Sequence, residues 1–192
     1  TSAVEALKLA KKLTAALDVL EIEEVSLDDV RELDLTPDLQ SHWQTAYADF
    51  LTIAVAYYQE LSARKLVSAP ARRNLLLDRF AANLPRDVPV IAAGITTAAP
   101  VIARLQKAVS RQPKGVVVWP HIDLQMGEGD WDALGPVKRE GASDLAEETH
   151  LQFHLKLLLD RMGIRRDEVV EFPAHKRDAG LESVDRIFAR AD

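Results

Sequence analysis

The chain contains no cysteine among its 192 residues. Disulfide bridges, cysteine-ligated zinc and iron–sulfur clusters are therefore excluded within it, because each of them requires thiol groups. No apolar run approaches the roughly 20 residues that a membrane-spanning helix needs, and no secretory signal opens the chain. These absences predict a protein of the cytoplasm, a reducing compartment, with no membrane as a partner.

The composition shows no excess of basic residues, which would by itself suggest nucleic-acid binding. Hydrophobic residues make up 47%, charged residues 28%, and the net charge is −6. This is a globular composition, and it disfavours a free-standing DNA-binding protein, which usually carries a basic face. Local basic pairs remain at residues 72–73, 165–166 and 176–177. Because a helical pattern starts directly at Thr1 without a methionine, we expect a piece of a longer protein.

The first 86 residues read as helical throughout. Apolar residues at three- and four-residue steps predict helices over residues 2–20, 27–33, 37–61 and 69–84. Ser26 is the expected N-cap of the second helix, and Pro37 suits the first turn of the third. That third helix carries an aromatic stripe from Trp43 onward. The periodicity favours helix packing over base stacking, since Asp49 and Glu60 neighbour the stripe.

The pattern changes to α/β from residue 87 onward. Apolar, β-branched runs at residues 89–93 and 115–119 predict two buried strands, and the amphipathic segment between them predicts a helix. Together they form a βαβ unit, which indicates a parallel sheet. Residues 127–148 read as a surface loop, 150–162 as a helix ended by Gly163, 168–172 as a third strand and 181–191 as a last helix. The expected fold class is α/β, with a helical subdomain at 1–86 and a partial parallel sheet at 87–192.

Gly94, Thr96 and Thr97 follow the first predicted strand, immediately before a helix. Ligands bind at this edge of open α/β sheets, and the N–H groups of a helix start favour phosphate. A Walker-type phosphate loop needs GxxxxGK[ST], and no lysine follows here. The alternatives are a plain strand-to-helix turn with Thr97 as N-cap, a nucleotide-binding loop, or a contact with DNA or a protein partner.

Two other groups of residues could carry chemistry. Asp123 is a single acid, and a phosphoryl-transfer site needs further acids and a phosphate cradle, so a structural or capping role is favoured. Glu147, His150 and His154 have the spacing E-x-x-H-x-x-x-H, which would place them on one helix face in a geometry that suits a metal. The competing interpretation of His150 is a buried, hydrogen-bonded histidine at a helix start. We predict no catalytic residue, metal site or cofactor in this chain.

Four blocks of sequence occur in a familiar order: HWQTAYADFLTI, APARRNLLLDRF, PVIAAGITTAAPVIARLQKAVSRQPKGVVVWPHID and THLQFHLKLLLDRMGIRRDEV. Together they resemble the N-terminal half of the AddB family in its alphaproteobacterial form. AddB proteins are the double-strand-break repair subunits of AddAB helicase–nucleases. The resemblance extends over about residues 6–173, and its most specific pieces are RRN at 72–74, VIAAG at 90–94 and H-x-Q-F at 150–153.

The resemblance implies a P-loop fold of superfamily-1 helicase type in which the preceding helices form a 1B-type subdomain. On this view Ala92 and Ala93 stand where related helicases carry the acids that hold Mg²⁺ and activate water. Asp123 and Gln125 echo the polar end of the next strand. The implied role is therefore non-catalytic: part of a DNA channel and of subunit packing. The implied partners are an AddA-type subunit, which carries the main motor, and DNA through the full complex.

The chain departs from the family pattern at three places. The loop that is usually GSTGS-like is GITTA here, Leu151 replaces a proline, and a Tyr-Tyr pair at 57–58 replaces Trp-Pro. The alternative functions are a small α/β domain that binds a metabolite or nucleotide at residues 94–97, and a helical interaction module with residues 1–86 as its docking surface. Candidate contacts with DNA or a partner are Gly94, Thr96, Thr97, Arg72, Arg73 and His150.

Overall fold

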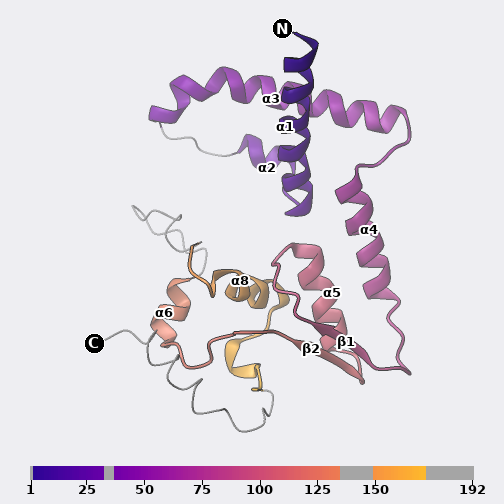
Figure 1. The fold of residues 1–192 in the computed structure, drawn as a ribbon, viewed down its shortest axis with the longest axis vertical. Helices are drawn as coiled ribbons and strands as arrows, with labels where there is room; N and C mark the ends of the chain where they lie inside the picture. The colour runs from indigo at the N-terminus through magenta and orange to yellow at the C-terminus, as the bar shows by residue number, and fades with distance from the viewer. Residues whose placement is uncertain (1, 33–36, 135–148, 172–192) are drawn as a thin grey trace.

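The computed structural model describes residues 2–32, 37–134 and 149–171 (Figure 1). The described helices are α1 (Ala3–Ile22), α2 (Leu27–Arg31), α3 (Pro37–Ala63), α4 (Ala69–Ala82), α5 (Pro100–Ser110), α6 (Glu128–Ala133) and α8 (Phe153–Met162). The strands are β1 (Val90–Ala93) and β2 (Gly115–Val118), and a 3-10 turn, η1, covers Arg166–Glu168. The helix predicted at 181–191, the basic pair at 176–177, Glu147 and the side chain of Trp43 lie outside what is described.

Side-chain caps explain where the helices of the first half begin. Ser2 and Ser26 each accept a hydrogen bond from the backbone N–H three residues on, and Glu5 and Asp29 return bonds to the two cap N–H groups. These capping boxes satisfy N–H groups that lack partners at a helix start. The predicted N-cap role of Ser26 is confirmed, as is the start of α3 at Pro37.

The two strands pair in parallel, with Val90 opposite Gly115 and Ala93 opposite Val118. The structure is mostly helical with a small parallel sheet, which agrees with the α/β class. The prediction that both strands are buried is wrong, because Ile91 is 66% exposed and Val116 is 47% exposed. Exposure alternates along β1, and the covering helix is α5, so the opposite face of the pair stays open among the described residues.

Two further sequence predictions need correction. Residues 127–148 are not loop throughout, because α6 begins at Glu128 and buries Trp131 against Leu159. Residues 168–172 do not form a strand over their described part. The chain there forms η1, which Arg165 precedes and ties down by an ion pair with Asp167. Residues 169–171 pair with no strand of the described part of the chain. A strand is stable only when it pairs with another strand, so a β-branched pattern alone does not determine whether a segment becomes one.

The core of the second half lies between α5 and α8. Ala98, Ala103, Leu158 and Met162 form one buried cluster, against which Trp119 packs. Gly163 ends α8 in the left-handed conformation with φ of 64°, which confirms its predicted role as a helix stop. Figure 1 shows α1, α2 and α3 at one end of the molecule, and α4 leading along one side to the sheet. Among the described helices, none has both the length and the apolar character to cross a bilayer.

Candidate functional site

The loop after β1 leaves the sheet where both strands have their carboxyl ends. The Gly94 N–H donates to the Val118 carbonyl at 2.9 Å, so the loop starts at the last rung of the ladder. Gly94 has φ of 72°, a left-handed conformation that glycine adopts without the cost borne by other residues. Gly94, Thr96 and Thr97 are all exposed to solvent. The structure thus places these three candidate residues together at the strand edge.

Thr97 is not the N-cap of the following helix, which corrects that prediction. The cap position is Ala99, which makes no side-chain hydrogen bond, and Pro100 occupies the first turn. A proline there fixes φ and has no N–H to satisfy, so a hydroxyl cap is not required. Ala98 and Ala99 are buried and fix the entry of the chain into α5.

A buried glutamine holds the loop in place. The Gln106 side chain is fully buried; its Nε2 donates to the Ile95 carbonyl at 3.2 Å, and its Oε1 accepts from Trp119 Nε1 at 2.7 Å. This bridge joins the loop, α5 and the end of β2. Sequence reasoning missed Gln106 because an amide normally faces solvent. The available signal was its helical spacing from Ala103 and Val109, both buried.

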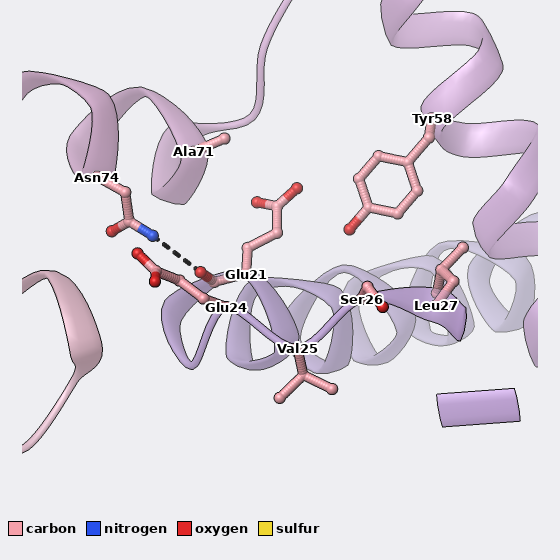
Figure 2. A pocket seen from close by; sticks show the side chains of 8 residues that line it. All are labelled: Glu21, Glu24, Val25, Ser26, Leu27, Tyr58, Ala71 and Asn74. Atoms are coloured by element: carbon pink, nitrogen blue, oxygen red, sulfur yellow. Dashed lines mark hydrogen bonds between the residues drawn. The ribbon is translucent and has the colours of Figure 1, made fainter. Parts of the chain in front are cut away.

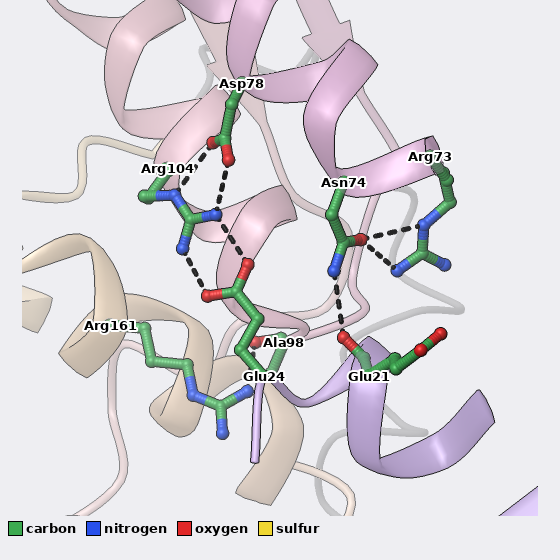
Figure 3. Close-up of polar contacts among 8 residues, drawn as sticks. All are labelled: Glu21, Glu24, Arg73, Asn74, Asp78, Ala98, Arg104 and Arg161. Carbon is green, nitrogen blue, oxygen red and sulfur yellow. Dashed lines mark hydrogen bonds and ion pairs between the residues drawn. The ribbon is translucent and has the colours of Figure 1, made fainter. Parts of the chain in front are cut away.

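Arg161 in α8 holds the other end of the loop. One guanidinium nitrogen, Nη1, donates to the Ala98 carbonyl (Figure 3). The same nitrogen also donates to Glu23 Oε2 at 2.9 Å. The loop is therefore tied to α8 and to the end of α1. Contacts from β2, α5 and α8 therefore anchor this short exposed segment.

Arg104 forms the main polar contact between the first and second halves of the chain. Its guanidinium donates two hydrogen bonds to Glu24 at 2.6 Å and two to Asp78 at 2.9 Å (Figure 3). These bonds to Glu24 and Asp78 raise the pKa of Arg104, so it stays charged. Glu24 has φ of 57°, a costly conformation for a residue with a side chain, and it ends α1 in a turn where the Val25 N–H donates to the Leu20 carbonyl at 2.8 Å.

The RRN block at residues 72–74 closes the end of α1. Asn74 is buried; its Nδ2 donates to the Glu21 carbonyl at 2.9 Å, and its Oδ1 accepts from Arg73 Nε and Nη2 at 3.2 and 2.9 Å. Arg72 is exposed and forms no ion pair within the described residues. Within that described part, no hydrogen bond or ion pair joins Arg72 or Arg73 to residues 94–97.

His150 is exposed, which corrects the prediction that it is buried. It precedes α8, which begins at Phe153, so it does not share a helix face with His154 as the spacing predicted. Its Nδ1 accepts a hydrogen bond from the Gln152 N–H at 3.1 Å, in agreement with the hydrogen-bonded part of that prediction. Asp123 Oδ1 accepts from two backbone N–H groups, a structural turn as predicted. Across the described ranges, no three histidine, aspartate or glutamate side chains gather into a metal site.

A pocket of about 510 Å³ lies at the end of α1 (Figure 2). It is lined by Glu21, Glu24, Val25, Ser26, Leu27, Tyr58, Ala71 and Asn74. The Glu21 carboxylate accepts a hydrogen bond from Ser68. Burial raises the pKa of Tyr58 to about 12, and the charge and hydrogen bonding of Glu21 add to the shift. The pocket does not include residues 94–97, and nothing in its lining resembles a phosphate cradle.

The Tyr58 shift predicts how stability changes in alkali. The folded pKa lies above the value of about 10 for tyrosine in an unfolded chain, so the unfolded chain loses this proton first. The contribution of Tyr58 to stability is complete below pH 10 and is lost as the pH rises toward 12. Urea unfolding at a series of alkaline pH values measures this loss. We expect the free energy of unfolding to fall less steeply with pH in Tyr58→Phe than in the original protein. If it falls equally steeply in both proteins, the raised pKa of Tyr58 is not the cause of the loss.

Fold and site define a mostly helical α/β protein in which an anchored loop without acidic residues lies at the edge of two parallel strands. Comparison with family models, with curated proteins and with solved structures found no match for this chain.

Proposed function

We propose that this chain is a helicase-like, non-catalytic part of a DNA double-strand-break repair helicase–nuclease of the AddAB type. The four collinear blocks described above support this assignment. The observation that carries the non-catalytic role is the end of β1, where the chain reads Ala92-Ala93-Gly94. We also propose that the parallel sheet is part of a P-loop domain of superfamily-1 helicase type.

Phosphoryl transfer needs acids that hold Mg²⁺ and a group that orients the attacking water. The methyl groups of Ala92 and Ala93 can do neither, because they have no oxygen or nitrogen to donate. Gln106 and Arg161 instead anchor the loop through hydrogen bonds to its backbone. The role that fits this chemistry is structural: lining a DNA channel and packing against neighbouring domains, with Gly94, Thr96 and Thr97 as exposed contact residues.

The partners under this proposal are an AddA-type subunit and DNA held by the full complex in the cytoplasm. ATP hydrolysis then belongs to the partner's motor, and the present chain contributes no catalytic group or cofactor. Arg72, Arg73 and His150 remain candidate contacts, since each has an exposed side chain. Any DNA contact through the arginines weakens with salt, because phosphate binding releases counterions.

Replacing Ala93 with serine in the full complex tests whether the end of β1 takes part in ATP hydrolysis. We expect ATP hydrolysis to change by less than about twofold, because an alanine methyl at this position takes no part in the reaction. A steady-state ATPase assay on broken duplex DNA measures it. The matched control removes the phosphate-loop lysine of the AddA-type partner, which should abolish hydrolysis. A loss of more than about tenfold with Ala93→Ser would place this strand in a working ATPase site.

The DNA on either side of the coding segment gives an independent test. The proposal expects an open frame that continues downstream into a cysteine-containing nuclease domain. A stop codon directly after Asp192 together with a start codon directly before Thr1 would contradict it.

A further inference from the structure

Helix α4 has apolar side chains on the face turned away from the protein. Pro70 and Asn74 are buried on its inner face, whereas Leu75, Leu76 and Phe80 are 58%, 49% and 53% exposed. Leu76 and Phe80 are one helical turn apart, and Leu75 adjoins Leu76, so the three form a short ridge. Exposed apolar residues that cluster on one face mark a contact surface more often than scattered ones do. We call Arg72, Leu75, Leu76, Arg79 and Phe80 the outer face of α4.

The charges of the outer face are all positive. Arg72 lies four residues before Leu76, and Arg79 lies three residues after it. Both arginines are therefore on the same side of the helix as Leu76. Neither forms an ion pair within the described part of the chain, whereas Arg104 and Arg161 are both paired. The single acid of α4, Asp78, is held by Arg104 toward α5. The outer face therefore offers two guanidinium groups that no described acid pairs with, beside an apolar ridge, in a protein of net charge −6.

We propose that the outer face of α4 binds an acidic amphipathic helix of a partner protein. The inference rests on the packing role proposed above and deepens it by naming the surface and the chemistry of its occupant. Leucine and phenylalanine one turn apart match the ridges of a second helix, and arginine pairs bidentately with carboxylates. Arginine and aromatic residues are also enriched where protein interfaces form.

The same observations disfavour single-stranded nucleic acid as the occupant. Such a strand stacks its bases on successive aromatic rings along a basic groove. The outer face has a single aromatic ring, Phe80, and two leucines occupy the centre, where a strand would need rings. An acidic helix satisfies the arginines and covers the leucines at the same time.

A synthetic amphipathic peptide of about three heptads is a direct probe. It carries leucine at its apolar positions and glutamate beside them, and a second peptide has lysine in place of each glutamate. Amide chemical shifts of the ¹⁵N-labelled chain report where each peptide binds. We expect the glutamate peptide to shift residues of α4, with an affinity that falls as salt rises, and the lysine peptide to bind at least about tenfold more weakly.

Two variants locate the contact. Leu76→Asp should weaken binding of the glutamate peptide by more than about tenfold, as loss of a central apolar contact does. Leu151→Asp is the matched control, since Leu151 is 90% exposed and lies outside α4, and it should leave binding unchanged. Circular dichroism checks that both variants keep their fold.

Several results would overturn the inference: equal binding of the two peptides, shifts centred outside α4, or no effect of Leu76→Asp. Shifts of α4 by an oligo-dT strand without shifts by the glutamate peptide would assign the face to nucleic acid instead. Failure of the proposed function is distinguishable, because binding of the glutamate peptide to α4 is measured on this chain alone and does not depend on DNA-end processing.

Discussion

Replacing Gln106 with leucine is expected to destabilise the protein by about 2–4 kcal/mol, because two hydrogen-bonding groups lose their partner in a place closed to water. The Trp119 indole N–H and the Ile95 carbonyl both bond to this one buried amide. Leucine has a similar volume, so the loss is one of hydrogen bonds rather than of packing. Urea unfolding followed by tryptophan fluorescence measures the change as a lower midpoint with an unchanged slope.

Gln112→Leu is the matched control for this prediction. The Gln112 Oε1 is buried and has no hydrogen-bond partner within the described part of the chain. Removing it should leave stability within about 0.5 kcal/mol or raise it, since an unsatisfied buried acceptor is lost. If the two leucine variants unfold at the same urea concentration, the bridge through Gln106 does not hold the loop.

Replacing Leu158 with alanine is expected to cost about 2–5 kcal/mol, the range for a large-to-small change in a closed core. Leu158 is fully buried and packs with Ala98 and Ala103. Because Ala98 belongs to the loop after β1, the cavity would loosen the strand edge as well as the contact of α8 with α5. Denaturant unfolding gives the free energy, and hydrogen exchange of the amides at residues 94–99 reports the loop.

The comparison variant is Leu151→Ala, the same change at a leucine that is 90% exposed. Its cost should stay within about 0.5 kcal/mol. A Leu158→Ala protein as stable as Leu151→Ala would mean that α8 does not form the core of the second half.

The sequence predicted the elements that depend on local chemistry. Ser26 as an N-cap, Pro37 at a helix start and Gly163 at a helix end all act within one turn of the chain, and the structure agrees with each. The parallel pairing of the two apolar runs also followed, because the connecting helix between them permits no tight hairpin.

What the sequence could not supply depends on long-range contacts. Whether a β-branched run becomes a strand depends on a neighbour, which the segment after Arg166–Glu168 lacks in the described structure. Gln106 resembles a surface residue until Trp119 and the Ile95 carbonyl are brought to it by the fold. That no hydrogen bond or ion pair joins the 72–73 pair to the 94–97 loop in the described structure likewise depends on how α4 and α5 pack.

The central claim is that this chain is a non-catalytic part of an ATP-dependent helicase–nuclease complex that acts on broken DNA ends. The most direct test is to tag the gene in its own organism, purify the native complex and measure degradation of linear and closed circular duplex DNA with and without ATP. The account predicts an AddA-type subunit in the complex and ATP-dependent degradation of the linear form alone. A complex without such a subunit, or without activity on DNA ends, would contradict it.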